Sequence, residues 1–248
     1  MKMNTTQKIL FSGLLIILIL LSIWIAFGLT ADEVKGETSL IEKISYQLAR
    51  IIPTKPTLKL DVPYHKQEHS LSCEVASLLM TLKYRGIDAT ESELIQQLPI
   101  SDPGPRSKNN IWGDPNIGFV GNIDGKMPNT GYGVYEKPIS DLANIYRASK
   151  IITSGKIQDL IAELKNDNPV IVWGVFGKSK NISWKTSEGK TINAKNNEHT
   201  RVLIGFTGPS NNPQSLIFLD SIHGEINEKT SDFIKNWKLL DNRAVVVY

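Results

Sequence analysis

One stretch without charge near the N-terminus limits what this chain can form. From Ile9 to Ala31 the sequence ILFSGLLIILILLSIWIAFGLTA contains no Asp, Glu, Lys or Arg. A helix of this length can cross a bilayer, whereas the apolar core of a cleaved signal peptide spans only about 7–15 residues. We therefore predict a transmembrane anchor at residues 9–31, preceded by a short tail at residues 1–8.

The charges on either side of this stretch predict its orientation. Lys2 and Lys8 precede it, and Asp32 and Glu33 follow it. By the positive-inside rule the N-terminus is expected in the cytoplasm and residues 32–248 outside, as a single-pass protein of the cell membrane. Cleavage after the apolar stretch would instead give a secreted protein, although Leu29 fits a small-x-small cleavage site poorly.

The remaining chain is long enough for one sizeable domain. Residues 32–57 are polar and mixed and are predicted to form a juxtamembrane linker. Residues 58–248 are predicted to form the domain. The net charge of the chain is +3, and two of the positive charges lie in the N-terminal tail. Because no basic stripe is present, a nucleic-acid partner is not expected.

The order of the predicted elements indicates the fold class. After a strand at residues 58–64, helical spacing of apolar residues predicts four helices, starting near Cys73, Glu91, Pro138 and residue 155. Short β-branched segments then predict strands at residues 170–176, 200–206, 215–220 and 244–248, with a helix at 231–240. Helices followed by strands are typical of an α+β fold, with an antiparallel sheet packed on an N-terminal helical half.

Cys73 is the only cysteine and cannot form an internal disulfide. It is predicted at the first turn of its helix, where free backbone N–H groups and the helix dipole favour an anion and lower a thiol pKa. Ser70 or Ser72 is expected to cap this helix. Gln67 precedes the cysteine by six residues, and its amide could donate to an oxyanion together with the Cys73 N–H.

Two residues of the second half can complete a catalytic group with this cysteine. His199 begins a predicted strand that could hold an imidazole against the helix start as a base. Asp220 ends the next strand, where a carboxylate could orient that imidazole and fix its tautomer. His223, in a predicted surface turn, stays open as an alternative base.

A zinc site is a weaker alternative. His65, His69 and Cys73 are spaced four residues apart and would align on a single helix. Pro63 and the polar residues before the cysteine indicate that the helix begins only near Cys73, so neither a metal nor a cofactor is expected.

The region 99–137 is rich in Gly, Pro, Asn and Asp and is predicted as a long loop, which is more often functional than idle. Trp112, Asp114 and Tyr132 are its candidate substrate-binding residues, with Trp112 as a wall of the cleft. Asp114 could instead close an Asx-turn before Pro115.

Several of these segments together resemble a known family. The run VPYHKQEHSLSCEVASLLMTLKYRG resembles the nucleophile region of the bacteriocin leader peptidase-like branch of papain-fold cysteine peptidases (family thirty-nine-like). WGDPNIGFVG with GYGVY looks like a loop of its stand-alone secreted members, EHTRVLIGF resembles its histidine strand, and LD its strand ending in Asp. The resemblance spans residues 60 to about 224.

This resemblance implies a papain-like fold and specific roles for four residues. Cys73 would be the nucleophile, His199 the general base and acid, Asp220 the orienting residue and Gln67 the oxyanion donor. Glu74 stands where many members have Gly, and adds negative charge near the thiolate. Ser221 stands where many have Pro.

The expected function is an extracytoplasmic cysteine peptidase that hydrolyses peptide bonds of a peptide or protein substrate through a thioester. Two alternatives stay open. The same fold could act as a cell-wall peptide hydrolase or acyltransferase, or it could be a catalytically inactive surface-binding module with an ordinary thiol.

Overall fold

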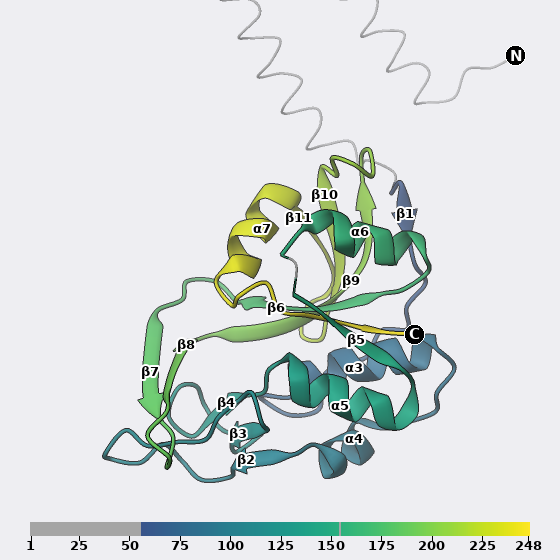
Figure 1. Cartoon of the computed structure of the whole chain (residues 1–248). Helices are drawn as coiled ribbons and strands as arrows, with labels where there is room; N and C mark the ends of the chain where they lie inside the picture. The colour runs from purple at the N-terminus through teal and green to yellow at the C-terminus, as the bar shows by residue number, and fades with distance from the viewer. Residues whose placement is uncertain (1–55, 154) are drawn as a thin grey trace, which may run out of the picture. The chain divides into compact units, whose positions relative to one another are not determined.

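An antiparallel sheet forms the centre of the described part of the chain (Figure 1). The computed structural model describes residues 56–153 and 155–248, within a compact unit that spans Lys55–Tyr248. Across this range no helix has the length and apolar character needed to cross a membrane. The predicted anchor at residues 9–31 and nearly all of the predicted linker lie outside the described residues.

Seven strands build the central sheet. In spatial order they are β11 (Gly224–Lys229), β10 (Ser215–Asp220), β9 (Glu198–Thr207), β6 (Val170–Val175), β12 (Ala244–Val247) and β5 (Ser149–Ile152), with β1 (Leu58–Lys59) pairing with β9. Every pair in this sheet is antiparallel. The mixed α/β architecture with an antiparallel sheet agrees with the predicted fold class.

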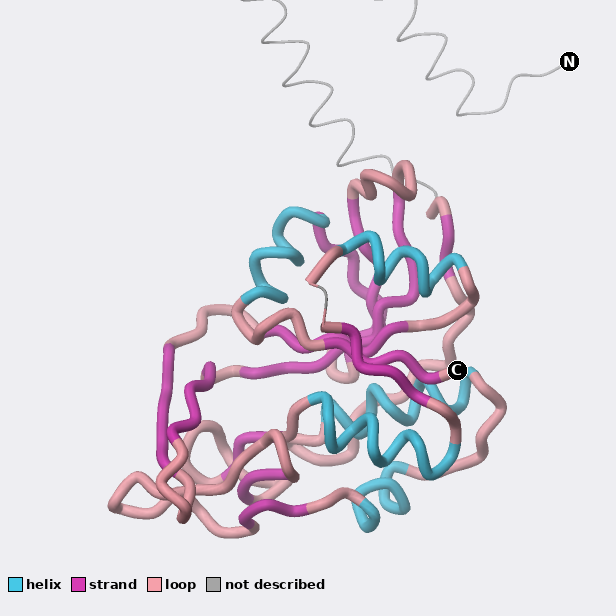
Figure 2. Tube along the Cα trace, viewed as in Figure 1, coloured by secondary structure: helices cyan, strands magenta, loops and turns pink. Residues whose placement is uncertain are grey.

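Both faces of the sheet are covered by helices, because its central strands are apolar on both sides. In β6, Ile171 and Trp173 belong to one hydrophobic cluster, and Val170 and Val172 to the other. Figure 2 shows helices on either side of the strands. The first cluster includes α3 (Cys73–Tyr84), α4 (Glu91–Gln97) and α5 (Glu136–Tyr146), and the second includes α6 (Ile157–Lys165) and α7 (Thr230–Lys238).

The structure confirms some of the helix caps predicted from the sequence and not others. Thr90 and Glu93 form the reciprocal capping box predicted for α4, and Gly86 has a positive φ of 76° just after α3. Ser72 is the N-cap of α3, but its hydroxyl makes no capping hydrogen bond; it donates to the His69 carbonyl instead. The first N–H groups of α3 are therefore not capped by that side chain.

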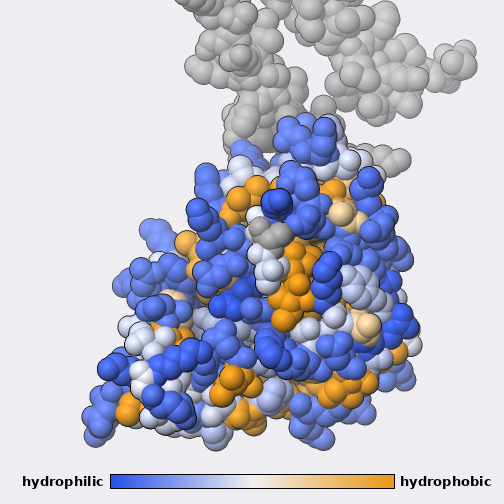
Figure 3. Space-filling model, viewed as in Figure 1, coloured by the Kyte–Doolittle hydropathy of each residue, from blue (hydrophilic) through white to orange (hydrophobic). Residues whose placement is uncertain are grey.

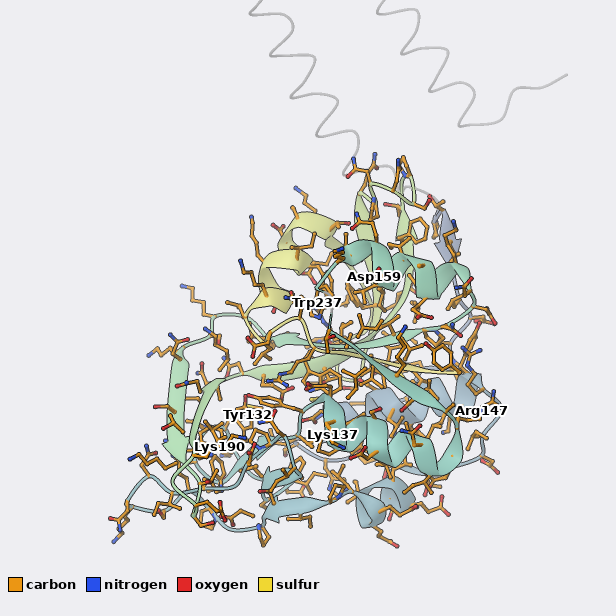
Figure 4. The ribbon with its side chains drawn as sticks, viewed as in Figure 1. Tyr132, Lys137, Arg147, Asp159, Lys190 and Trp237 are labelled. Atoms are coloured by element: carbon orange, nitrogen blue, oxygen red, sulfur yellow. The ribbon has the colours of Figure 1, made fainter. Side chains whose placement is uncertain are left out.

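The segment predicted as one long loop contains a small sheet of its own. Its strands are β2 (Ile100–Asp102), β3 (Phe119–Gly121) and β4 (Gly131–Gly133). A hairpin of β7 (Asn181–Lys185) and β8 (Thr191–Lys195) packs beside it through Trp184, which meets Trp112 and Tyr132 edge to face. In Figure 4, Tyr132 lies on the opposite side of the central sheet from Trp237 of α7.

The molecular surface fits this layered core. On the face shown in Figure 3, hydrophobic residues form small separate patches within a mainly hydrophilic surface.

The predicted strand at residues 58–64 is shorter than expected, since only Leu58 and Lys59 pair with β9. The polar strands β5, β7, β8 and β11 were not predicted from the sequence.

Candidate active site

A pocket of about 410 Å3 lies where α3 and β9 begin. We call it the Cys73 pocket, because Cys73 and His199 both line it although they are far apart in the sequence. Polar lining comes also from Gln67, Glu74 and Glu198. Apolar lining comes from Leu71, Met127, Tyr132, Phe176 and Ile222.

Strand register brings His199 to Asp220. Arg201 of β9 pairs directly with Asp220 of β10, and His199 lies two residues before Arg201. Directly paired residues and residues two apart share a face of a sheet, so the imidazole and the carboxyl group are diagonal neighbours. The His199 Nε2 and Asp220 Oδ2 atoms are 2.9 Å apart, and both residues are buried.

Asp220 is held as a carboxylate. Burial alone would raise its pKa, but hydrogen bonds from His199 and from the backbone N–H groups of Ile222 and His223 outweigh burial and hold the pKa well below its ordinary value. Because an ionised carboxylate only accepts, Nε2 of His199 carries a proton. The other ring nitrogen, Nδ1, is then the atom that can accept a proton in the neutral imidazole.

His223 contacts the second carboxyl oxygen of Asp220. Its Nδ1 is 3.1 Å from Asp220 Oδ1, and its ring stacks on Phe176 with centroids 4.9 Å apart. His223 does not line the Cys73 pocket. The geometry therefore favours His199 over His223 as the partner of the thiol.

The thiol of Cys73 does not match the expectation from its helix position. Its side chain is buried, and Sγ donates to Glu74 Oε2 at 3.3 Å. Burial first, and then the carboxyl groups of Glu74 and Glu198, raise the pKa of Cys73 well above its ordinary value. The helix N-terminus was expected to lower this pKa; desolvation and the two acidic neighbours exceed that effect.

Gln67 reaches the pocket with its amide already engaged. Its Nε2 donates to the carbonyls of His69 and Ser70, and its Oε1 accepts from the Ser221 hydroxyl at 2.7 Å. Both amide hydrogens thus have acceptors, and donation to an oxyanion requires one of these bonds to open. Ser221, which departs from the family pattern, is the residue that ties Gln67 to the end of β10.

Two glutamates stand beside the thiol. Glu74 follows Cys73 on α3, and Glu198 precedes His199 on β9; both are buried. Glu74 Oε1 accepts the Val134 N–H at 2.7 Å. The sequence drew attention to Glu74 only as a departure from the family, and nothing in a single sequence distinguished Glu198 from an ordinary strand residue.

The three loop residues predicted to bind substrate have different positions. Tyr132 lines the Cys73 pocket, with its hydroxyl 2.9 Å from that of Tyr135. Trp112 and Asp114 do not line it. Trp112 is buried and donates to the Gly104 carbonyl, so it is a packing residue and not a cleft wall.

Asp114 also has a structural role. It accepts the backbone N–H of Asn116 at 2.9 Å, as in an Asx-turn, and pairs with Lys190 at 2.6 Å. The 99–137 region still reaches the pocket through Gly125, Lys126 and Met127.

The histidines of the zinc alternative have separate partners. His65 Nε2 lies 2.6 Å from Glu91 Oε2, and His69 Nδ1 lies 3.1 Å from Asp124. These two imidazoles do not converge on Cys73 within the described chain, because α3 begins only at the cysteine. The arrangement of hydrogen-bonded imidazole–carboxyl pairs does not support the zinc site.

Comparison with known proteins identifies the family. Residues 59–245 match the family model described as the peptidase C39-like family. An uncharacterized protein of Bacillus subtilis (strain 168), YvpB, is 34% identical over 182 residues, which cover 71% of this chain and 68% of the relative.

A solved structure gives the same assignment. The crystal structure of a Bacillus anthracis protein classed as a C39-like peptidase has 28% identity and a TM-score of 0.67, covering 77% of this chain and 96% of that chain. With a family match over most of its length, a curated relative and a structural neighbour, this chain belongs to the peptidase C39-like family.

Proposed function

We propose that this protein is a cysteine peptidase that hydrolyses peptide bonds through a thioester on Cys73, with His199 as base and acid and Asp220 as orienting residue. The observation that carries the proposal is the convergence of Cys73 and His199 on one pocket, with His199 bonded to Asp220. Membership of a peptidase family supports the reaction class.

The reaction begins with proton transfer from the Cys73 thiol to Nδ1 of His199. The thiolate attacks the carbonyl carbon of the scissile bond, forming the S–C bond, and the carbonyl oxygen takes up the negative charge. His199 then returns its proton to the amine nitrogen as the C–N bond breaks and the amine leaves. Asp220 stabilises the imidazolium throughout, without taking the proton itself.

Water completes the cycle. His199 removes a proton from a water molecule, whose oxygen attacks the thioester carbon. The C–S bond breaks, the acid product leaves, and Cys73 recovers a proton from His199. The backbone N–H of Cys73, at the first position of α3 and so without a partner inside the helix, is suited to stabilise the oxyanion.

The pocket suggests a class of substrate. Phe176 and Ile222 are about half exposed and line it together with Leu71 and Met127. Apolar side chains at the mouth of a site favour apolar side chains of a ligand. We therefore propose that the preferred substrates are peptides with an apolar residue near the scissile bond, and that highly charged peptides are poorer substrates.

We further propose that the peptidase is anchored in the cell membrane through residues 9–31, with the catalytic domain outside. Cell fractionation and protease treatment of intact cells test this. Recovery in the membrane fraction, with the domain digested from outside, is expected; a domain digested only after lysis would contradict the proposed orientation.

The peptidase activity is tested on the purified full chain in mild detergent, incubated with unfolded casein and a mixed peptide library. Cleavage is expected, and it should be lost on prior treatment with iodoacetamide and in Cys73→Ala. A Ser70→Ala variant, altered close to the site but not in the thiol, serves as control. Cleavage by Cys73→Ala at the wild-type rate would exclude a thioester on Cys73.

A further inference from the structure

Glu74 and Glu198 form a close carboxyl pair next to the thiol. The Cys73 Sγ atom and one carboxyl oxygen from each glutamate lie within 4.8 Å of one another. Gly133 of β4 packs against both carboxyl groups, and a Cβ there would collide with Glu74 Oε1 and lie 2.9 Å from Glu198 Oε2. With a φ of 138°, Gly133 has a conformation that other residues rarely adopt. The backbone of β4 thus packs directly on both acids.

The hydrogen bonds of the pair leave one oxygen without a partner. Glu74 accepts the Val134 N–H and the Cys73 thiol, and Glu198 Oε1 accepts the Thr200 hydroxyl at 3.3 Å. Glu198 Oε2 is buried and has no hydrogen-bond partner. A buried carboxylate oxygen in this state is costly, whereas a shared proton would satisfy it.

No salt bridge compensates the two charges. Within residues 56–153 and 155–248 no ion pair includes either glutamate, and Arg243, whose charge acts on Glu198, is paired with Glu136 and Asp241. Two buried carboxylates this close together disfavour ionisation of both groups when such compensation is lacking. The titratable or charged groups that face the pair are Cys73 from α3, Tyr132 from β4, Tyr135 after it and Arg243 before β12.

We propose that Glu74 and Glu198 act as a carboxyl pair that retains one proton at neutral pH, and that Glu74 donates it in a hydrogen bond to the Cys73 thiolate. This inference deepens the peptidase function proposed above. Glu74, which touches Sγ, would be a further catalytic residue, and Glu198, which acts through Glu74, a positioning residue.

The proton count of the step is conserved. In the resting state the thiol proton points to Glu74 Oε2, and the proton of the pair is held by Glu198. When His199 takes the thiol proton, the proton of the pair moves to Glu74 Oε2 and is shared with the sulfur, and Glu198 carries the charge. The thiolate then has a donor at the 3.3 Å contact where it would otherwise meet a carboxylate.

The direction of the pH effect follows. Burial raises the pKa of Glu74 to about 7, and burial together with the Glu74 carboxyl group raises that of Glu198 well above its ordinary value. As the pH rises through this range the pair loses its proton. Glu74 then can only accept, and a second negative charge next to Sγ disfavours the thiolate.

Alkylation of the single cysteine tests the proposal without a substrate. Iodoacetamide rates are measured on the full chain from pH 5 to 10 for wild type, Glu74→Gln, Glu198→Gln and the remote control Glu93→Gln. Glutamine can keep the bond from Val134 and donate to sulfur, but it cannot ionise. Both pair variants should lower the midpoint by about one pH unit, about a tenfold rise in thiolate below it. An unchanged or higher midpoint in Glu74→Gln overturns the proposal.

Infrared spectra of the wild-type protein give a second measurement that does not depend on folding of the variants. A protonated carboxyl band should persist at pH 6.5, where exposed acids are ionised, and weaken as the pH rises further. Absence of this band overturns the proposal. Failure of the peptidase function would instead appear as undiminished casein cleavage by Cys73→Ala, whatever the band does.

Discussion

Asp220 accepts a hydrogen bond from His199 with one carboxyl oxygen and hydrogen bonds from a turn of backbone with the other. Oδ2 lies 2.9 Å from His199 Nε2, and Oδ1 accepts the N–H groups of Ile222 and His223 at 2.9 and 3.1 Å. The strand end of β10 and the imidazole of β9 are therefore fixed by the same side chain. This division of labour makes the role of Asp220 testable by a change that preserves its shape.

Asp220→Asn should lower kcat/KM by roughly 10²–10⁴-fold, the range expected when a catalytic imidazole loses its orientation. An amide has a single acceptor oxygen, so its NH2 group must face either the two backbone N–H groups or the Nε2–H of His199. The measurement is peptide hydrolysis at neutral pH, with thermal unfolding as a control for the fold. Full activity in a folded variant would contradict the orienting role.

Gln67→Ala should reduce kcat by about 100-fold if the amide turns to the oxyanion during the reaction, with a smaller effect on KM. The resting bonds to His69 and Ser70 are to neutral carbonyls and can open for a charged acceptor. Ser221→Ala, which removes only the hydroxyl that holds Oε1, is the matched control and should retain most activity. A change in KM alone would place Gln67 in substrate binding.

Glu74→Gln should stabilise the fold at high pH and hardly at low pH. The folded-state pKa of Glu74 is raised from 4.5 to about 7, so the folded protein binds more protons than the unfolded chain between these values. Stability is then lost as the pH rises from about 4.5 to 7, by up to ~3 kcal/mol. The glutamine variant avoids this loss, and urea unfolding at pH 5 and pH 8 measures the difference. A gain of equal size at both values would contradict the assignment.

Phe176→Ala should raise KM for substrates with an apolar residue near the scissile bond by about tenfold, since the loss of one apolar contact surface costs about 1–2 kcal/mol. Phe176 is 54% exposed and contacts the ring of His199 at 6.1 Å between centroids. Comparison of apolar and charged peptides measures the effect. Ile145→Ala, also exposed but on α5 away from the pocket, is the control.

The sequence predicted the parts of the fold that have strong local signals. Apolar periodicity marked α3 and α6, and the Thr90–Glu93 box marked the start of α4. β10 was predicted with its observed limits because it is apolar on both faces and ends at a charged residue. In contrast, β7 and β11 alternate with polar residues and are held by their hairpin partners, which local propensity does not report.

Some features of the candidate site could be predicted from the sequence, and others could not. Cys73, His199 and Asp220 were identified from residue type and from their positions at the ends of predicted elements, and the fold brings Cys73 and His199 to one pocket and Asp220 to His199. The raised thiol pKa and the part played by Glu198 could not be anticipated. They depend on burial and on a carboxyl group more than 100 residues away from the cysteine, which only tertiary packing determines.

Two consecutive residues of β9 place an acid and a base at the candidate site. Glu198 and His199 point to opposite faces of the strand, the carboxyl toward Glu74 and Gly133, the imidazole toward Asp220. A slip of one residue in the pairing of β9 with β10 would turn the imidazole away from Asp220 and bring a neighbouring side chain such as Glu198 to its place. Insertions in the turn between β8 and β9 should therefore inactivate the protein even where it folds, whereas the turn at 208–214 between β9 and β10, at the other end of β9, should tolerate added length.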